Sequence, residues 1–329
     1  MQAVVAPCGA PPQRIGFRQQ ILGQIKDTLH VLRPFLEDEQ VNEIMVNAPN
    51  EVFISRAGKD FRAPVRLGAG EISAAITLVA TMVSKEVGDK SGHLILSGRL
   101  PGFRVEAILP PVAVNGPSMC IRRHCSRLQS LEQYVAEGVM SQEHAQLLDS
   151  AITAHESFLI VGGTGSGKTT LMNTALARMD PRERLFIIES VHELQVQADN
   201  HVLLECDEEQ GINARRAVRS AMRYAPKRII VGELRGAEAY DWLDAANTGH
   251  PGSAATLHAN SANAALGRLE NLLLMADMGV PFEPLRMRIA ETVRWMFYIQ
   301  RDGAKRRVSQ VGRVHSYDRA KGAYEIESF

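Results

Sequence analysis

The stretch "GGTGSGKTT", residues 162–170, has the composition and spacing of a loop that holds phosphate. It matches G-x-x-x-x-G-K-[ST] between the apolar run "SFLIV" and a run with helical spacing. Glycines let successive backbone N–H groups point at phosphate oxygens, and the following helix adds the positive end of its dipole. We therefore expect a nucleoside triphosphate to bind Gly162, Gly163, Thr164, Gly165, Ser166, Gly167, Lys168, Thr169 and Thr170.

Two side chains of this loop carry specific roles. We expect Lys168 to reach the β- and γ-phosphates, and the Thr169 hydroxyl to ligate Mg²⁺. A purely structural glycine turn is the alternative. It accounts less well for an apolar strand directly before the loop and a helix directly after it.

A carboxylate is expected beside the phosphates. Glu233 ends the predicted strand "RIIVGE", and the carboxyl ends of parallel strands converge where a ligand binds. A carboxylate there can act as the general base that polarises the attacking water, and can hold a magnesium-bound water. The alternatives for Glu233 are a helix N-cap and a surface acid, and the neighbouring phosphate loop argues against both.

Two other predicted strand ends carry polar side chains. Glu189 ends "RLFIIE" and is a candidate second partner for magnesium or water, or a strand end that is simply polar. His258 follows "SAATL" and is a candidate hydrogen-bond donor to the γ-phosphate, or a histidine satisfied within the core. His250 and His258 are eight residues apart around a strand, which argues against a shared metal ion.

The elements that position these residues fall into two groups. An α+β pattern is predicted first, with helical spacing over 17–36 and 71–86, a turn over 57–60, and strands over 41–47, 51–56, 103–111 and 118–123. Strands and helices then alternate, which predicts a mainly parallel sheet covered by helices, followed by a hairpin that turns near 302–303. We expect a flexible N-terminus over 1–16, an α+β domain over 17–123, a linker over 124–130 and an α/β domain over 131–329.

Composition narrows the class of protein. Lys plus Arg and Asp plus Glu both number 37, and this balance argues against binding nucleic acid through bulk positive charge. No apolar run approaches the roughly 20 residues of a membrane-spanning helix, and the N-terminus lacks the pattern of a secretory signal. Any membrane contact is therefore expected to be peripheral. The four cysteines lack zinc-ligand spacing, so we expect reduced thiols in a cytosolic protein.

Four motifs in order, "GGTGSGKTT", "IIESVHEL", "RIIVGELRG" and "TGHPGSAATLHANSA", resemble the motif boxes of the secretion (traffic) ATPases. Those motors power type IV secretion, type II secretion and type IV pili. The resemblance covers residues ~37–300 and is closest to the conjugal-transfer, TrbB-like members. No cysteine follows Cys206, whereas pilus-assembly and type II members commonly carry a four-cysteine zinc element after the catalytic region.

The resemblance implies an α/β architecture, with a RecA-like P-loop ATPase domain over 131–329 and a smaller PAS-like α+β domain before it. It also implies a homohexameric ring that binds ATP and Mg²⁺ between the two domains. By the same similarity, Arg104 and Arg122 of the N-terminal domain reach the phosphates, and Arg235 joins an interdomain or intersubunit network. The ring would lie in the cytoplasm, docked on inner-membrane components of a secretion or conjugation channel.

One position departs from the family pattern. An acid usually follows the residue equivalent to Glu189, whereas this chain has Ser190. Loss of that charge beside the expected magnesium site predicts slower hydrolysis with intact nucleotide binding.

Three alternative functions remain at this point. The first is the ATPase of a type IV pilus or a type II secretion system. The second is a RecA-like nucleic-acid motor, favoured by the basic stretch "ARRAVRSAMRYAPKR" but disfavoured by an aromatic content of 5% and by the balanced charge. The third is a binding or scaffold module with a vestigial loop, which the presence of Lys168, Thr169, Glu233 and His258 argues against.

Overall fold

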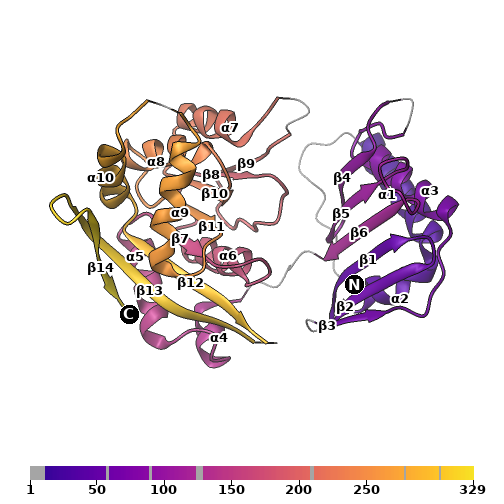
Figure 1. Ribbon diagram of the computed structural model, residues 1–329, viewed down its shortest axis with the longest axis horizontal. Helices are drawn as coiled ribbons and strands as arrows, with labels where there is room; N and C mark the ends of the chain where they lie inside the picture. The colour runs from indigo at the N-terminus through magenta and orange to yellow at the C-terminus, as the bar shows by residue number, and fades with distance from the viewer. Residues whose placement is uncertain are drawn as a thin grey trace. The chain divides into compact units, whose positions relative to one another are not determined.

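The computed structural model describes residues 12–56, 59–88, 91–123, 129–207, 211–277, 279–303 and 305–329, and the side chains of 12–18 are not described. The chain divides into two compact units, Met1–Cys125 and Ser126–Phe329 (Figure 1). Residues 124–128 of the predicted linker and residues 1–11 of the predicted flexible N-terminus lie outside the described residues. The first helix begins at Pro12, earlier than predicted, because proline is well suited to a first helical turn.

The N-terminal unit is an antiparallel sheet in the order β3-β2-β1-β6-β5-β4, with α1 and α3 packed together against its core. Its helices are α1 (Pro12–Thr28), η1 (His30–Leu32), α2 (Arg33–Glu37) and α3 (Ala69–Met82). Its strands are β1 (Val41–Ala48), β2 (Glu51–Arg56), β3 (Lys59–Arg62), β4 (Ile95–Leu100), β5 (Phe103–Ile108) and β6 (Ser118–Arg123).

Side chains along β5 alternate between the face of the sheet that packs in the core and the opposite face. Val105 and Ala107 are buried in the core, so Arg104 and Glu106 point to the opposite face. Arg104 lies directly opposite Arg122 in the pairing of β5 with β6. Directly opposed residues of antiparallel strands share a face, so these two arginines lie side by side.

Several predicted boundaries in this unit are wrong. The strand predicted over 103–111 ends at Ile108, and the helix predicted over 71–86 is Ala69–Met82. The helix predicted over 17–36 ends at Thr28, and a short α2 follows with Pro34 near its start. Proline has no N–H to continue the helical ladder, so the chain breaks before it. The predicted turn 57–60 is also shorter, because Lys59 and Asp60 belong to β3 and pair with β2.

The C-terminal unit is a sheet in the order β14-β13-β12-β7-β11-β10-β8-β9, parallel from β12 to β9 and antiparallel at β13 and β14. Its helices are α4 (Leu131–Ala136), α5 (Gln142–Thr153), α6 (Lys168–Arg178), α7 (Ala214–Ala221), η2 (Met222–Tyr224), α8 (Glu238–Asn247), α9 (Ala262–Leu274) and α10 (Phe282–Thr292). Its strands are β7 (Phe158–Val161), β8 (Leu185–Glu189), β9 (His201–Glu205), β10 (Arg228–Leu234), β11 (Ala254–Leu257), β12 (Trp295–Asp302), β13 (Lys305–Asp318) and β14 (Ala323–Ser328).

Helices cover both faces of this sheet, so its central strand is apolar throughout. Phe158 and Ile160 of β7 pack in a core with α4, α5 and α6. Leu159 and Val161 pack in a second core with α7, α8, α9 and α10. The carboxyl ends of β7, β8, β10 and β11 therefore meet at one edge, and a predicted site residue lies in or directly after the end of each strand. Every helix among the described residues is too short or too polar to cross a membrane.

A buried ion pair fastens the opposite, amino edge of the parallel strands. Arg228 opens β10, is 1% exposed and donates through Nε to Glu183 at 2.6 Å. It also donates to the carbonyls of Ile152 and Gly252, and His155 contacts the same carboxylate at 2.8 Å. Burial alone would raise the pKa of Glu183, but Arg228 and His155 outweigh it and hold that pKa below its usual range.

We expect Glu183→Gln to destabilise the C-terminal unit by about 3 kcal/mol at neutral pH, because it leaves the Arg228 charge buried without its partner. Urea unfolding followed by tryptophan fluorescence measures this, since both tryptophans, Trp242 and Trp295, lie in this unit. Asp149→Asn, which breaks an exposed pair with Arg178, should cost less than about 1 kcal/mol.

The difference in unfolding free energy between the parent protein and Glu183→Gln should change with pH in a definite direction. A carboxylate whose pKa is lowered in the folded state stabilises that state at pH values above its unfolded pKa of about 4.3. This stabilisation is lost as the pH falls through the pKa of the folded state. The gap between the parent and Glu183→Gln should therefore shrink in acid. A gap that is absent at neutral pH, or that widens in acid, contradicts the role given to this pair.

Candidate nucleotide site

The loop between β7 and α6 has a backbone that requires glycine. Gly165 and Gly167 have φ of +69° and +105°, in the left-handed region that residues with a Cβ avoid. At Gly162 a Cβ would lie 2.2 Å from the Ile299 carbonyl oxygen and 2.6 Å from Ser166 Oγ. A side chain at Gly162 would force the loop away from β12, and one at Gly165 or Gly167 would strain the backbone.

The loop is built to receive an anion. Ser166 is 2% exposed, and its Oγ is buried with no hydrogen-bond partner among the described residues. An unsatisfied buried hydroxyl costs about 1–3 kcal/mol, and a phosphate oxygen would remove that cost. Gly167 is the N-cap of α6, where backbone N–H groups and the helix dipole also favour negative charge. The residues of this loop therefore fit a polyphosphate.

Lys168 lies over the mouth of the loop. Its side chain is largely buried, and Nζ donates to the carbonyl oxygens of Gly162 at 3.0 Å and Gly163 at 2.9 Å. Burial lowers the pKa of Lys168 to about 8, although the charge of Glu233 acts in the opposite direction. A nearby anion would favour the charged form of this ammonium group.

Glu233, His258 and Arg235 form a connected cluster beside Lys168. His258 Nε2 lies 2.8 Å from Glu233 Oε1, and both of its ring nitrogens lie 3.3 Å from Lys168 Nζ. Burial and the charge of Lys168 lower the pKa of His258, which favours a neutral ring. The tautomer with its proton on Nε2 donates to Glu233 and accepts from Lys168. Arg235 Nε donates to the other oxygen of Glu233 at 2.8 Å.

Glu189 lies at the same edge and organises the loop that follows β8. It is 7% exposed, and its Oε1 accepts from the backbone N–H groups of Glu193 and Leu194, both at 3.0 Å. Its Oε2 lies 3.1 Å from His192 Nδ1. These contacts are those of a carboxylate that holds a loop, and its predicted contact with magnesium or water stays a prediction. Ser190, which follows, is exposed.

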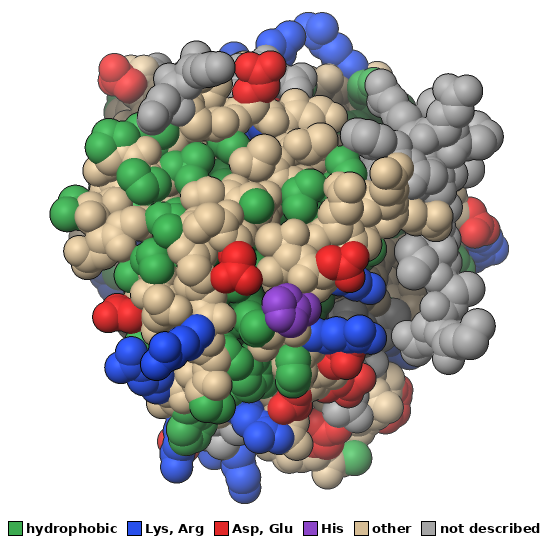
Figure 2. Space-filling model, turned by 90° about the vertical axis from the view of Figure 1, so that its right-hand side faces the viewer, with side chains coloured by type: hydrophobic (Ala, Val, Ile, Leu, Met, Phe, Trp, Pro, Cys, Tyr) green, Lys and Arg blue, Asp and Glu red, His purple; other side chains and the backbone are tan. Residues whose placement is uncertain are grey.

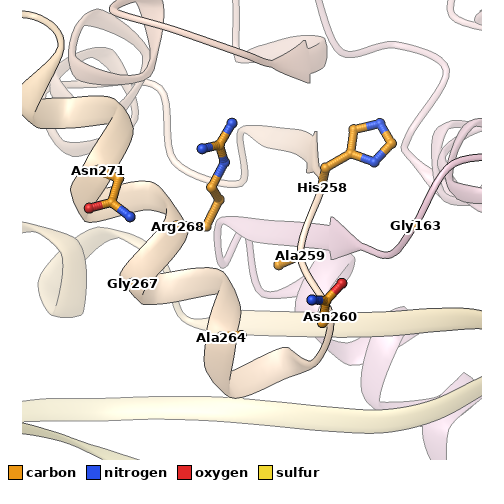
Figure 3. Close-up of a pocket in the computed structure, with 8 residues that line it drawn as sticks. All are labelled: Gly163, His258, Ala259, Asn260, Ala264, Gly267, Arg268 and Asn271. Atoms are coloured by element: carbon orange, nitrogen blue, oxygen red, sulfur yellow. The ribbon is translucent and has the colours of Figure 1, made fainter.

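Two residues that sequence reasoning missed complete this edge. Asn173 of α6 is 1% exposed and accepts from the N–H of Gln195, so it ties the same loop to the helix after the glycines. Arg268 extends from α9 into a cavity of about 430 Å³ that Gly163 and His258 also line (Figure 3). Its charge contributes to lowering the His258 pKa. Neither residue lies in a motif, so no local signal marks it.

The basic stretch over 214–228 is partly neutralised. Arg215 and Arg219 of α7 both donate to Asp241 of α8, at 2.7 Å and 2.6 Å. Arg228 is the buried partner of Glu183. Figure 2 looks onto the N-terminal unit rather than onto this stretch, and there too Lys and Arg side chains are interspersed with Asp and Glu in the lower half. Pairs of this kind leave less free positive charge for a nucleic acid backbone.

The structure brings together four of the predicted site residues, Lys168, Glu233, Arg235 and His258. Arg104 and Arg122 lie in the N-terminal unit, where Arg122 donates to Glu43 at 3.1 Å and Arg104 lies 3.9 Å from Glu106.

A glycine-rich phosphate loop joins the central parallel strand β7 to helix α6, and Glu233 lies near the end of β10, two strands away. This arrangement defines a P-loop NTPase of the RecA-like class. The comparisons with known proteins are more specific. The chain belongs to the family described as Type II/IV secretion system protein, which matches residues 26–301.

Individual relatives agree with this family. The chain is 40% identical over 298 residues to the probable conjugal transfer protein TrbB of Sinorhizobium fredii, covering 89% of this chain and 88% of the relative. It is 32% identical over 322 residues to the type IV secretion system protein VirB11 of Brucella suis, covering 86% of this chain and 88% of the relative. The fold is similar to that of the Legionella pneumophila ATPase DotB, with a TM-score of 0.57 at 21% identity, covering 89% and 78% of the two chains. The predicted family and the predicted fold class are confirmed.

Proposed function

We propose that the protein is the ATP-hydrolysing, hexameric motor of a type IV secretion or conjugal-transfer apparatus. The observation that carries the proposal is the contact chain from Lys168 through His258 to Glu233 at the mouth of the glycine loop. This set gives one cation for the phosphates and one carboxylate for a water, as hydrolysis of a nucleoside triphosphate requires. Relatives named for conjugal transfer and type IV secretion, matched over most of their length, supply the biological context.

In the proposed reaction Glu233 is the general base. It orients a water against the γ-phosphorus and accepts its proton, while Lys168 stabilises charge on the phosphate oxygens. His258 holds Glu233 through the 2.8 Å contact and can also donate to the γ-phosphate once Glu233 turns toward the water. Arg235 must release Glu233 at that point, so its ion pair is a natural place for a neighbouring domain or subunit to act on the rate.

Magnesium fits the oxygen donors of this edge. Thr169 follows Lys168 at the start of α6, and its hydroxyl is the expected protein ligand, with Glu233 and Glu189 as partners of magnesium-bound water. When bound, Mg²⁺ would neutralise charge on the β- and γ-phosphates.

We further propose that Arg104 and Arg122 bring the N-terminal domain to the phosphates. Both lie on the sheet face away from α1 and α3, and they are direct cross-strand neighbours. Guanidinium groups delivered by a second domain would stabilise phosphate charge only in a closed arrangement, which couples hydrolysis to domain motion. The proposed location is the cytoplasmic face of the inner membrane, by peripheral association with components of the channel.

Light scattering with size-exclusion chromatography tests the assembled motor. With a non-hydrolysable ATP analogue the full chain should elute with the mass of six chains, and Lys168→Ala should assemble less under the same conditions. A chain that stays monomeric at saturating nucleotide contradicts the hexameric motor.

A further inference from the structure

The hairpin formed by β12 and β13 extends past the end of the strand that carries the phosphate loop. β12 runs parallel to β7 with Tyr298 opposite Val161, the last residue of β7. It continues to Asp302 before the chain turns back as β13 (Figure 1). Because the two strands are parallel and adjacent, the end of this hairpin projects at the same edge as the glycine loop.

This end of the hairpin is strongly basic. It carries four cations and one acid, namely Arg301, Lys305, Arg306, Arg307 and Asp302. Side chains alternate between the two faces of β13, so neighbouring arginines point in opposite directions. Only one of Arg306 and Arg307 can face the loop.

Arg306 is the one that contacts it. A Cβ placed on Gly167 would lie 2.9 Å from Arg306 Cδ and 3.4 Å from its Nε. The Arg306 side chain thus crosses the loop beside the N-cap of α6, and only a glycine at 167 leaves room for it.

The charges around Arg306 favour the binding of an anion. Within the described ranges no carboxylate forms an ion pair with it, and the side chain is exposed. Its neighbours are the positive end of α6 and the loop that carries Lys168, both of which repel a guanidinium group. A phosphate at the loop would turn this repulsion into attraction, and the planar guanidinium group can donate two parallel hydrogen bonds to it.

We propose that Arg306 is a nucleotide-binding residue that contacts a phosphate of the bound nucleoside triphosphate from the hairpin side. The hairpin is then a wall of the nucleotide site. This proposal rests on the proposed function, since it assigns a second cation to the same phosphates that Lys168 binds.

The test is the affinity of the full chain for a fluorescent, non-hydrolysable ATP analogue, which carries all three phosphates. Arg306→Ala should raise the Kd about tenfold, in line with the loss of one charge-assisted hydrogen-bonding group. Arg307→Ala is the matched control, because it removes the same charge from the next residue on the opposite face, and its Kd should stay within about twofold. Arg306→Lys should recover part of the loss, because it keeps the charge without the planar fork.

Salt separates a phosphate contact from a stacking contact. The loss caused by Arg306→Ala should shrink as ionic strength rises, because salt screens a charge–phosphate interaction. A loss that is unchanged by salt indicates stacking on the base and overturns the proposal, as does equal behaviour of Arg306→Ala and Arg307→Ala. If Lys168→Ala still abolishes binding in that case, the proposed function stands and only the role of Arg306 fails.

Discussion

Lys168→Ala should lower the affinity for ATP and ADP by at least about 100-fold and abolish hydrolysis. Each hydrogen bond from a charged donor contributes about 1.5–3 kcal/mol, and we expect Lys168 Nζ, which donates to the carbonyls of Gly162 and Gly163 in this structure, to donate to the phosphates of a bound nucleotide. Burial already lowers the pKa of this ammonium group to about 8 in the nucleotide-free protein, so most of the cost of burying it is not incurred again when the nucleotide binds. Equilibrium titration with a fluorescent nucleotide measures the effect.

Lys227→Ala is the control for the lysine substitution. Lys227 is exposed and directly precedes Arg228 at the amino edge of the sheet, so its removal should leave nucleotide affinity within about twofold. If Lys168→Ala binds nucleotide as tightly as this control, the glycine loop is not the phosphate site and the proposed function fails.

Glu233→Gln should separate binding from chemistry. We expect kcat to fall by about 10²–10⁴-fold, the usual contribution of a general base, with nucleotide affinity retained within about threefold. The amide keeps the shape of the side chain and can still contact His258, so the cluster around Lys168 should remain in place. Steady-state release of phosphate, with binding titrated separately, gives both numbers.

The outcomes for Glu233 discriminate a general base from a carboxylate that only positions its neighbours. Glu291→Gln, an exposed glutamate of α10, should leave both constants unchanged. A Glu233→Gln protein that hydrolyses ATP at the parental rate would show that another group takes the proton. Equal loss of binding and turnover would instead assign Glu233 a role in holding Lys168 and His258.

The parts of the fold with strong local patterns were predictable from the sequence. The buried run of β7 and the apolar faces of α5 and α9 mark the α/β alternation, because helices cover both sides of the sheet. Strand β4 was missed because Gly98 looks like a turn residue. Its glycine is required by packing, since a Cβ there would lie 2.7 Å from Val79 Cγ1 of α3.

Other elements lack a pattern of their own. Strand β3 is exposed along its whole length, so no alternation marks it. Helix α10 and strand β14 were also missed, and both are stabilised by partners distant in sequence. Arg286 of α10 and Tyr324 of β14 share the carboxylate of Glu270, which belongs to α9.

The site was predictable where one motif carried it and hidden where the fold assembles it. Spacing alone predicted Lys168 and the glycines, and the strand-end rule predicted Glu233 and His258. Arg268 and Arg306 come close to the loop only because α9 and β13 pack there. The contacts that hold Glu189 depend on the path of the loop after β8, which no spacing rule gives.

The buried arginine at the amino edge implies a division of labour along each parallel strand. The ion pair of Arg228 and Glu183 stabilises the amino edge of the parallel strands. The glycine loop and Glu233 lie at the carboxyl edge, a full strand length away. Because the sheet is stabilised at its amino edge, the sequences of the loops at its carboxyl edge are free to diverge. Mutations in those loops do not weaken the ion pair. Related motors could therefore acquire new regulators or cargo at the carboxyl edge of the sheet while they retain the same amino edge.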